Sequence, residues 1–581
     1  MTEATYRQQV DARGQQILQA CYERGSHLSL WSFHAALACG GDADDLVAVA
    51  ERYHEPGPFS IIPGIVLLNR WPEQIPSAAE HHIKQMFTHS MQQRGNTENH
   101  WLMFYVGNLL AAERWADEPI FWNGLPPAVM HAEASRWILG MIARMSTIGH
   151  YEYDSTGYHT EHFVPYLALA EYAHDPLVRA QAAKAAQLLL VDMALEYFHG
   201  AYAGGHSREG NVNTWTEIGP GQVLNYLYFG DEEFEPDRHC HGFAIPAAAA
   251  AFRPPALLAR MALDRDTPHV VRKTKPPRAV YRHVQHTPGV VRKYTWMSRS
   301  FALGSTQTGL TEAPAGPIDL TSWDLTWQGA RNRAKICCNH PYRSARRFSA
   351  FLPELPQRVG RAVGSVKPHL QVPDRLFGAS PYERMMQHEG TIIVLYQIPA
   401  ADETPYVNCF LPKGHTWCER DGWILCDFGD FYAGVRPIGS YRWEDIYEAG
   451  PYGNWLEGWL LRISDLKAGL VLEAVEKEQV GGFDEFCQMR GSAHLDLSQW
   501  REGGSVCVDS LNGSNLQMTY DGRHCVDGQD IDYDDYPLFG GPGVDAPLGN
   551  GKFRVTHGGD ELTLDFGADQ AKEFTPMRVI G

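Results

Sequence analysis

The chain has 581 residues, of which 44% are hydrophobic and 20% are charged, an ordinary composition for a globular protein of two or three domains. Its formal net charge of −19 excludes a broad nucleic-acid-binding surface, because neutralising phosphates requires a basic face. The N-terminal stretch is charged throughout, unlike a signal peptide, and no window is apolar enough for a membrane span. We therefore expect a cytoplasmic protein whose 11 cysteines are reduced thiols.

Residues 1–265 are predicted to be almost entirely helical. Apolar residues recur at spacings of three and four, as in Ile138, Met141, Ile142 and Met145. We expect helices at 5–23, 28–38, 43–53, 60–69, 78–93, 98–115, 128–146, 162–174, 176–198, 210–229 and 243–263. Short polar links indicate stacked helical hairpins, either closed into an (α/α) toroid or left as an open solenoid. No fixed-period repeat is present, which disfavours tetratricopeptide and HEAT arrays.

The composition and residue pattern of the sequence change after the helical region. Residues 266–280 are rich in proline and charge, which is typical of a linker, so we place a domain boundary there. From 281 to 581, short β-rich runs are separated by Gly, Asn, Asp or Pro, which predicts a large antiparallel β-sandwich. The expected fold class is α+β, with an incomplete (α/α) toroid as the catalytic domain at 1–265 and one or more β-sandwich domains at 281–581.

The β region contains one conspicuous basic cluster in an otherwise acidic chain. Its members are Arg331, Arg333, Lys335, Arg343, Arg346 and Arg347. Such a cluster can bind carboxylates, and it can equally be a solvated loop or a protein-contact patch. Cys337 and Cys338 lie beside His340, but no second group has zinc-site spacing, so we expect buried thiols here.

Three clusters in the helical region carry chemically capable side chains, and the first is NTENHW at 96–101. Asn96 or Thr97 is a good N-cap for the apolar run that follows, so Asn99 and His100 fall in the first helical turn. There an amide and an imidazole can bind a substrate carboxylate. The alternative is plain capping with a packed histidine.

The second cluster is the polar stretch YEYDSTGYHTEHFVPY at 151–166. A tyrosine near a histidine can transfer protons once neighbouring positive charge lowers the tyrosine pKa. The candidates are Tyr153, Tyr158 and His159 as acid or base, and Glu161 and His162 as substrate-binding residues. His159 and His162 could also form half of a metal site, but no third ligand is specified, and we predict no metal ligands. Single residues of this stretch could simply lie at the edge of the core.

The third cluster is GGHSREGN at 204–211. Its glycines free the backbone, and Arg208 is suited to bidentate recognition of a carboxylate. His206 is a further acid or base candidate, and Glu209 and Asn211 are substrate-binding candidates. The alternative is a helix start capped by Ser207 with Arg–Glu pairs on its surface.

Together these clusters supply groups that neutralise a carboxylate and groups that move a proton. That inventory suits abstraction of a proton next to a carboxylate, followed by β-elimination. Asn, His and Arg would stabilise the enolate-like dianion, which is usually the largest catalytic contribution. Tyr or His would remove the C5 proton, and Tyr would return a proton to the leaving oxygen.

On these residues the chain resembles the heparinase II/III and alginate-lyase-like superfamily of polysaccharide lyases. The likeness covers nearly the whole length as architecture, and at residue level it comprises Asn99-His100, Tyr158-His159 and the loop of His206 and Arg208. It implies an incomplete (α/α) toroid with a β-sandwich, and Asn, His, Arg and Tyr around a uronate. It implies no cofactor, although some members carry a structural divalent metal in the β region. A missing secretion signal departs from many relatives and favours intracellular oligosaccharides.

We therefore expect a carbohydrate-active lyase that cleaves an anionic oligosaccharide or polysaccharide, with no nucleic-acid or membrane partner. An incomplete toroid also leaves room for a second copy of the chain to close its cleft. The alternative is a glycoside hydrolase on an (α/α) barrel. Its carboxylate pair would come from Glu98, Glu152, Asp154, Glu161 and Glu209. A non-catalytic carbohydrate-binding protein would need aromatics without converging ionisable groups, which the density at 151–162 disfavours.

Overall fold

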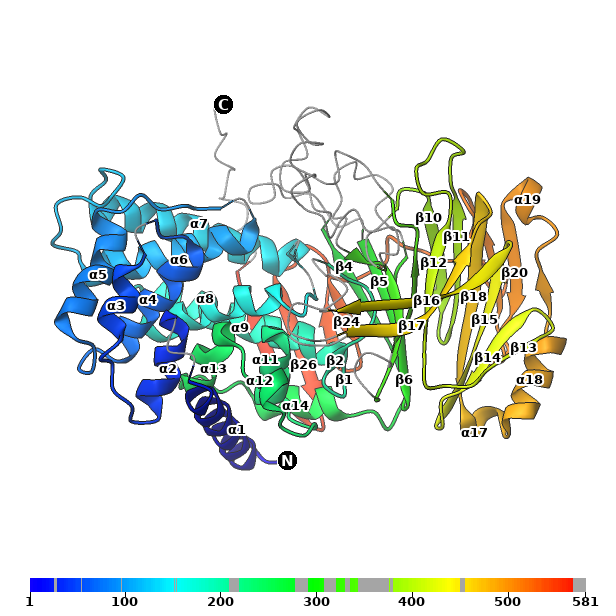
Figure 1. Cartoon of the computed structure of the whole chain (residues 1–581), viewed down its shortest axis with the longest axis horizontal. Coiled ribbons are helices and arrows are strands. Elements are labelled where there is room, and N and C mark those ends of the chain that lie inside the picture. The colour runs from blue at the N-terminus through cyan, green and yellow to red at the C-terminus, as the bar shows by residue number, and fades with distance from the viewer. Residues whose placement is uncertain are drawn as a thin grey trace.

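A computed structural model describes most of the chain. The described residues are 1–25, 29–53, 55–95, 97–150, 152, 154–207, 219–276, 291–307, 320–329, 335–342, 376, 380–449 and 455–567. N-terminal helices are followed by antiparallel sheets, as predicted (Figure 1). No helix in these ranges is both long enough and apolar enough to cross a bilayer.

Helices make up most of the first half of the chain. They are α1 Glu3–Glu23, α2 Leu30–Ala38, α3 Leu46–Glu51, α4 Pro58–Arg70, α5 Ser77–Thr88, α6 Glu98–Arg114, α7 Pro127–Ile148, α8 Tyr158–Tyr172, α9 Pro176–Leu195, α11 Pro220–Tyr228, α12 Pro236–His239, η1 Gly242–Ala244, α13 Ile245–Ala249 and α14 Ala256–Leu263. The helices predicted as far as residue 195 are confirmed, with ends displaced by a few residues.

Two of the predicted helices differ from those observed: one ends earlier, and the other is broken into two. The helix expected at 176–198 stops at Leu195, because the chain turns into a hairpin of β1 Tyr197–Phe198 and β2 Ala201–Tyr202. The turn residues His199 and Gly200 both have positive φ, of 47° and 86°, the conformation that tight two-residue hairpins require. The helix expected at 243–263 is broken between α13 and α14, where consecutive prolines remove backbone donors. Of the helix expected at 210–229, residues 210–218 lie outside the described residues.

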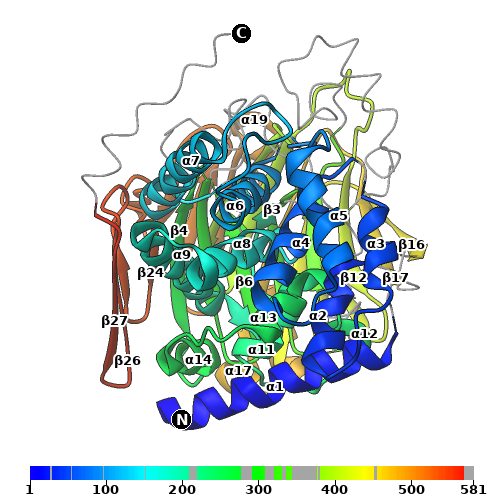
Figure 2. The same ribbon diagram turned by 90° about the vertical axis from the view of Figure 1, so that its left-hand side faces the viewer.

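Helices α4, α6 and α8 lie side by side in front of the sheets (Figure 2). Their N-terminal ends meet at one end of the helical layer. Near the start of α4, the ring of Phe59 lies 5.3 Å from the ring of His100 in the first turn of α6. Just before α8, Glu152 accepts a hydrogen bond at 2.5 Å from the side-chain amide of Asn99 in the first turn of α6. The polar clusters predicted at 96–101 and 151–166 are therefore brought to the same end.

The strands form three main sheets. Their bounds are β3 His206–Ser207, β4 His269–Lys275, β5 Val291–Met297, β6 Phe301–Thr306, β7 Leu320–Thr321, β8 Trp323–Trp327, β9 Lys335–Asn339, β10 Glu383–His388, β11 Thr391–Gln397, β12 Val407–Pro412, β13 Trp417–Arg420, β14 Trp423–Asp427, β15 Phe431–Ile438, β16 Tyr441–Ala449, β17 Trp455–Ile463, β18 Lys467–Glu476, β19 Leu495–Asp496, β20 Ser505–Asp509, β21 Asn515–Thr519, β22 His524–Val526, β23 Gln529–Asp530, β24 Phe539–Gly541, β25 Val544–Ala546, β26 Lys552–His557 and β27 Asp560–Asp565. Three short helices accompany them: α17 Lys477–Val480, α18 Phe483–Ser492 and α19 Trp500–Gly503.

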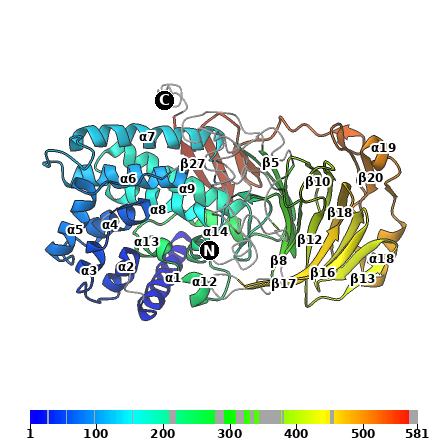
Figure 3. The same cartoon turned by 45° about the horizontal axis from the view of Figure 1, so that its top comes forward.

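The sheets are stacked in layers beyond the helices (Figure 3). A 12-stranded sheet runs β16-β17-β12-β9-β8-β6-β5-β4-β24-β25-β26-β27, and a six-stranded sheet runs β10-β11-β18-β15-β14-β13. They share one apolar core, in which Leu303 and Leu325 of the larger sheet pack with Ile392 of the smaller. The opposite face of the six-stranded sheet packs on α18 and on a five-stranded sheet, β19–β23.

The C-terminal strands return to the helices. Strand β24 pairs with β4, and Phe539 and Phe553 belong to the same apolar core as the helices (Figure 1). Strand β4 itself lies within 266–280, which we expected to be a linker, so that expectation was wrong for residues 269–275. The lysines that gave this segment its linker-like composition are buried against carboxylates.

Close packing at Gly304 of β6 gives a test of how the sheet meets the helical half. A Cβ added at Gly304 would lie 2.5 Å from Cα of Gly204, which has a φ of +82°. We expect Gly304→Ala to lower the free energy of unfolding by about 1–3 kcal/mol, because overpacking forces the backbones apart. Urea denaturation measures the change. Gly503→Ala is the control, since its Cβ would meet nothing nearer than 3.8 Å; equal midpoints for the two variants would contradict the close approach.

Candidate functional site

Lysine side chains cover the face of the 12-stranded sheet that meets the helices. Lys273 and Lys275 of β4 and Lys293 of β5 are fully buried. Lys273 lies directly opposite Lys293 in the antiparallel register. Like charges in directly opposed positions destabilise a sheet. This face of the sheet therefore requires counter-charges from the helical side.

Carboxylates from the helical half supply those counter-charges. Lys293 Nζ donates to Asp154 Oδ2 at 2.5 Å and to Glu196 Oε2 at 2.7 Å. Lys273 Nζ donates to the same Glu196 oxygen at 2.6 Å. Asp192 lies in the last turns of α9. Its Oδ1 is 2.6 Å from Lys273 Nζ, and its Oδ2 is 2.5 Å from Lys275 Nζ. Each lysine in this layer is therefore paired with at least one carboxylate.

Asp154 is the carboxylate most strongly affected by this layer. Burial by itself would raise the pKa of Asp154, but the ammonium groups of Lys273, Lys275 and Lys293 outweigh burial and hold that pKa well below its usual range. Its backbone has a φ of 49°, in the left-handed region that few residues other than glycine adopt. The ion pairs therefore hold a strained loop in place directly before α8.

A further ion pair extends the layer to the predicted loop at 204–211. Lys335 Nζ of β9 donates to Asp324 Oδ2 of β8 at 2.7 Å, and Asp324 Oδ1 accepts the Gly204 N–H at 2.8 Å. Of the predicted basic cluster, Lys335 alone is described, and it forms this internal pair. The neighbouring Cys337 and Cys338 are buried free thiols, as predicted.

Three histidines lie against this charged layer. The ring of His150 is 5.5 Å from that of His159 and 5.2 Å from that of His162, and all three are buried. Burial lowers the pKa of His150 well below its usual value and lowers the pKa of His159 to about 4. Both rings are therefore neutral at pH 7. His159 also stacks on Tyr202, whose hydroxyl lies 3.3 Å from His159 Nδ1.

Asn99 and His162 meet on one carboxylate, that of Glu152. The backbone N–H and the side-chain amide of Asn99 both donate to Glu152 Oε2, at 3.2 and 2.5 Å. His162 Nε2 lies 3.3 Å from the same oxygen. Glu152 thus joins the first turn of α6 to α8. The amide that we predicted to bind a substrate carboxylate here holds a carboxylate of the protein itself.

The remaining predicted site residues fall into three groups. His206 on β3 is buried, and its pKa is lowered well below the usual value by burial and by nearby Lys335 and Lys293. Tyr158, Glu161 and His100 are half-buried at the N-terminal ends of α8 and α6. The His100 ring lies against Phe59 and Gly95. The predicted residues outside the described ranges are Tyr153, Arg208, Glu209 and Asn211.

Sequence reasoning missed Tyr202, His150 and the lysine layer. Val271, Lys273 and Lys275 lie at every second position, on one face of β4, but the charge and prolines of this segment are typical of a linker. Tyr202 carries no signal of its own, because only the β1–β2 hairpin brings it under His159.

His150, His159 and Asp192 present ligand atoms that all lie within 4.8 Å of one another, a spacing that could hold a metal ion. However, both oxygens of Asp192 already contact lysine ammonium groups. A divalent cation placed there would face those positive charges at close range in a buried setting. The arrangement favours an internal ion-pair network over a cation site.

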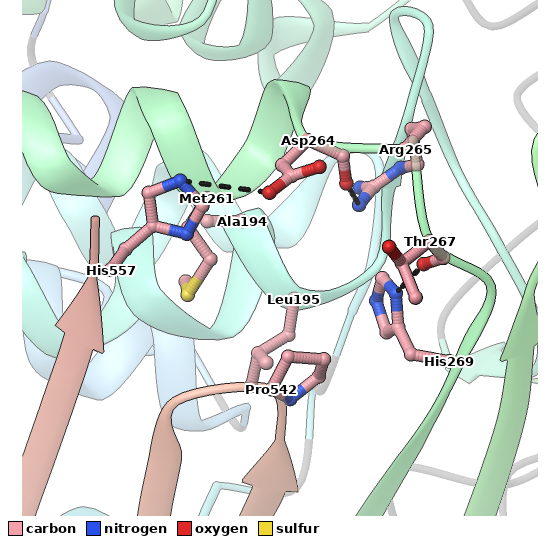
Figure 4. Close-up of a pocket in the computed structure, with 9 residues that line it drawn as sticks. All are labelled: Ala194, Leu195, Met261, Asp264, Arg265, Thr267, His269, Pro542 and His557. Atoms are coloured by element: carbon pink, nitrogen blue, oxygen red, sulfur yellow. Dashed lines mark hydrogen bonds and ion pairs between the residues drawn. The ribbon is translucent and has the colours of Figure 1, made fainter.

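The structure also contains a cavity of about 110 Å³ at the C-terminal end of α9 (Figure 4). Its lining residues are Ala194, Leu195, Met261, Asp264, Arg265, Thr267, His269, Pro542 and His557. Ligand sites for drug-sized molecules usually enclose about 300–1,000 Å³. This cavity is too small for a glycan and contains none of the predicted site residues. The predicted residues Asn99 and His162 meet instead at the N-terminal ends of α6 and α8, which we take as the candidate site.

No family model matches the chain, and no curated protein matches it either.

Lys293 tests the energetic role of the buried layer. We expect Lys293→Met to reduce the free energy of unfolding by about 3–5 kcal/mol, because it leaves Asp154 and Glu196 with less compensation in a buried setting. Urea denaturation measures the loss. Arg554→Met removes the exposed pair with Glu561 and should leave the midpoint unchanged. Similar midpoints for both variants would refute the role of the layer.

The buried histidines predict a dependence of stability on pH. The unfolded chain binds a proton at His159 below about pH 6.5, whereas the folded protein binds it only near pH 4. The free energy of unfolding should therefore fall as the pH is lowered from 6.5, by about 2–3 kcal/mol at pH 4.5 from this residue. In His159→Gln the slope of stability against pH should be shallower over that window, measured by urea denaturation at several pH values. An unchanged slope would argue against a neutral buried His159.

Proposed function

We propose that this chain is a lyase that cleaves a uronate-containing glycan by β-elimination, on an incomplete helical toroid packed against a β-sandwich. The observation that carries the proposal is the position of Tyr158 and His100. Both are half-buried at the N-terminal ends of α8 and α6, which Glu152 joins through Asn99 and His162. A substrate at this end would meet the phenol of Tyr158 and the imidazole of His100.

The helix dipoles at this end favour an anionic group, against the first-turn carboxylates of Glu98 and Glu161. Helices α6 and α8 direct their N-terminal N–H groups and the positive ends of their dipoles toward it. Asn99 is fully buried and its amide is engaged by Glu152, so the donors open to a substrate are the half-buried His100 and Tyr158. Together these donors would stabilise the negative charge that develops on a uronate carboxylate when its C5 proton leaves.

The proton transfers are assigned to Tyr158. It is half-buried and within reach of a substrate, whereas Tyr202 is 2% exposed. In the proposed reaction the deprotonated Tyr158 removes the C5 proton, the electron pair forms the C4–C5 double bond, and the bond from C4 to the leaving oxygen breaks. Tyr158 returns a proton to that oxygen. The contact of Tyr202 with neutral His159 would keep the wall of the site in a fixed arrangement.

A glycoside hydrolase has less support from the same residues. That chemistry requires two carboxyl groups, one of which must be protonated at working pH. Asp154 is paired with lysines that hold its pKa well below the usual range, and Glu152 is bonded to Asn99 and lies against His162. These two carboxylates are engaged by the protein itself and Glu98 is fully buried, so among the described candidates Glu161 alone is partly exposed, which favours elimination over hydrolysis.

The reaction class is tested with a panel of oligosaccharides of mannuronate, guluronate, glucuronate and galacturonate, together with neutral oligosaccharides. Ultraviolet absorbance reports the conjugated double bond, and a reducing-end assay reports every cleavage. We expect both signals on at least one uronate substrate and neither on neutral glycans. Reducing ends without new absorbance would indicate a hydrolase, and the absence of both signals would refute an enzyme of either class on these sugars.

Tyr158→Phe tests the assigned acid. Removing the hydroxyl should lower turnover by at least about 100-fold, the usual contribution of a positioned acid or base, while substrate binding and melting temperature are retained. Tyr172→Phe, at the other end of the same helix, is the matched control and should keep full turnover. Wild-type turnover in Tyr158→Phe would remove this residue from the mechanism.

A further inference from the structure

Phe59 is exposed in a way that packing does not explain. It is 43% exposed, and of the phenylalanine, tyrosine and tryptophan side chains whose exposure the structure describes, it alone is largely open to solvent. Its neighbours in the chain, Pro58 and Ser60, are both buried. The exposed apolar surface is thus a single ring, far smaller than a stable protein interface needs.

The Phe59 ring is nevertheless held in place. It meets the His100 ring at 5.3 Å with the planes at 87°, and the Phe243 ring at 5.8 Å with the planes at 72°. Behind it, Trp31 packs on Phe243 at 4.6 Å. A ring fixed by two edge-to-face contacts loses little conformational freedom when a ligand binds to it.

The position of His100 connects this ring to the proposed site. His100 follows Asn99 directly in the first turn of α6, so the ring contact places Phe59 one side chain away from the proposed carboxylate-binding groups. A close approach fixes this arrangement, because a Cβ at Gly95 would lie 2.3 Å from His100 Nδ1. A flat apolar ring beside a polar site suits the C–H face of a pyranose.

We propose that Phe59 forms a stacking subsite for the sugar ring next to the uronate that is cleaved, and so sets a preference for longer oligosaccharides. The subsite rests on the proposed lyase function. Its ligand is a third pyranose of the same glycan, joined to the reacting uronate on the side away from the bond that breaks, so a disaccharide substrate lacks it. Disaccharides would leave the Phe59 ring uncovered, whereas tetrasaccharides would cover it.

The test compares wild type, Phe59→Ala, Phe59→Trp and the control Leu177→Ala on the disaccharide and tetrasaccharide of the uronate that the wild type cleaves. Leu177 is similarly exposed, at 42%, and lies in the first turn of α9, a neighbour of α8. Phe59→Ala should raise KM for the tetrasaccharide about 5–10-fold, the size of one lost aromatic stacking contact, with kcat retained. Disaccharide kinetics and melting temperature should stay near wild type, and Phe59→Trp should keep the tetrasaccharide preference.

Equal losses on both substrate lengths, or no loss on the tetrasaccharide, would overturn the subsite while leaving the lyase function intact. If the wild type cleaves no uronate, the proposed function fails. Calorimetric titration with the uncleaved tetrasaccharides of the four uronates then tests the subsite separately. Binding that weakens about 5–10-fold in Phe59→Ala would support it. Identical binding by the two proteins, or no binding by the wild type, would overturn it.

Discussion

The structure depends on a buried layer of opposite charges between the helices and the 12-stranded sheet. Lys273, Lys275 and Lys293 face Asp154, Asp192 and Glu196, and none of these side chains is more than 1% exposed. Removing so many charges from water costs several kcal/mol for each ion, and their mutual attraction offsets that cost only when every partner is present. Neither half of the protein could bury its own face of this layer without the other.

This layer also fixes the candidate site. Asp154 is held in a strained conformation directly before α8, and Glu152, two residues earlier, ties α6 to α8 through Asn99 and His162. The backbone that carries the side chains of the proposed site is therefore fixed, and these side chains need not be buried themselves. Tyr158 and His100 remain half-buried at the N-terminal ends of their helices.

The helical half could be predicted well from sequence because its apolar spacing is regular and its caps are strong, as at Thr97 and Asp175. The co-location of Asn99 and His162 was also within reach, since both lie near helix starts. Strand β4 could not be predicted, because a strand of seven residues offers only a short residue pattern, and a segment that combines lysine with proline resembles a linker. The partners of those lysines lie about 80–140 residues away in sequence, so no local pattern records them.

The return of β24–β27 to the helices has a consequence for how the chain is made. Leu538, Phe539 and Phe553 complete an apolar core that begins at Tyr6. During synthesis the N-terminal helices emerge first, yet part of their packing surface waits for the last strands of the chain. Contacts that span nearly the whole sequence close slowly, because the intervening chain must be ordered before they form. The newly made helical half therefore exposes apolar surface until translation is almost finished, a period in which chaperones would find a binding surface.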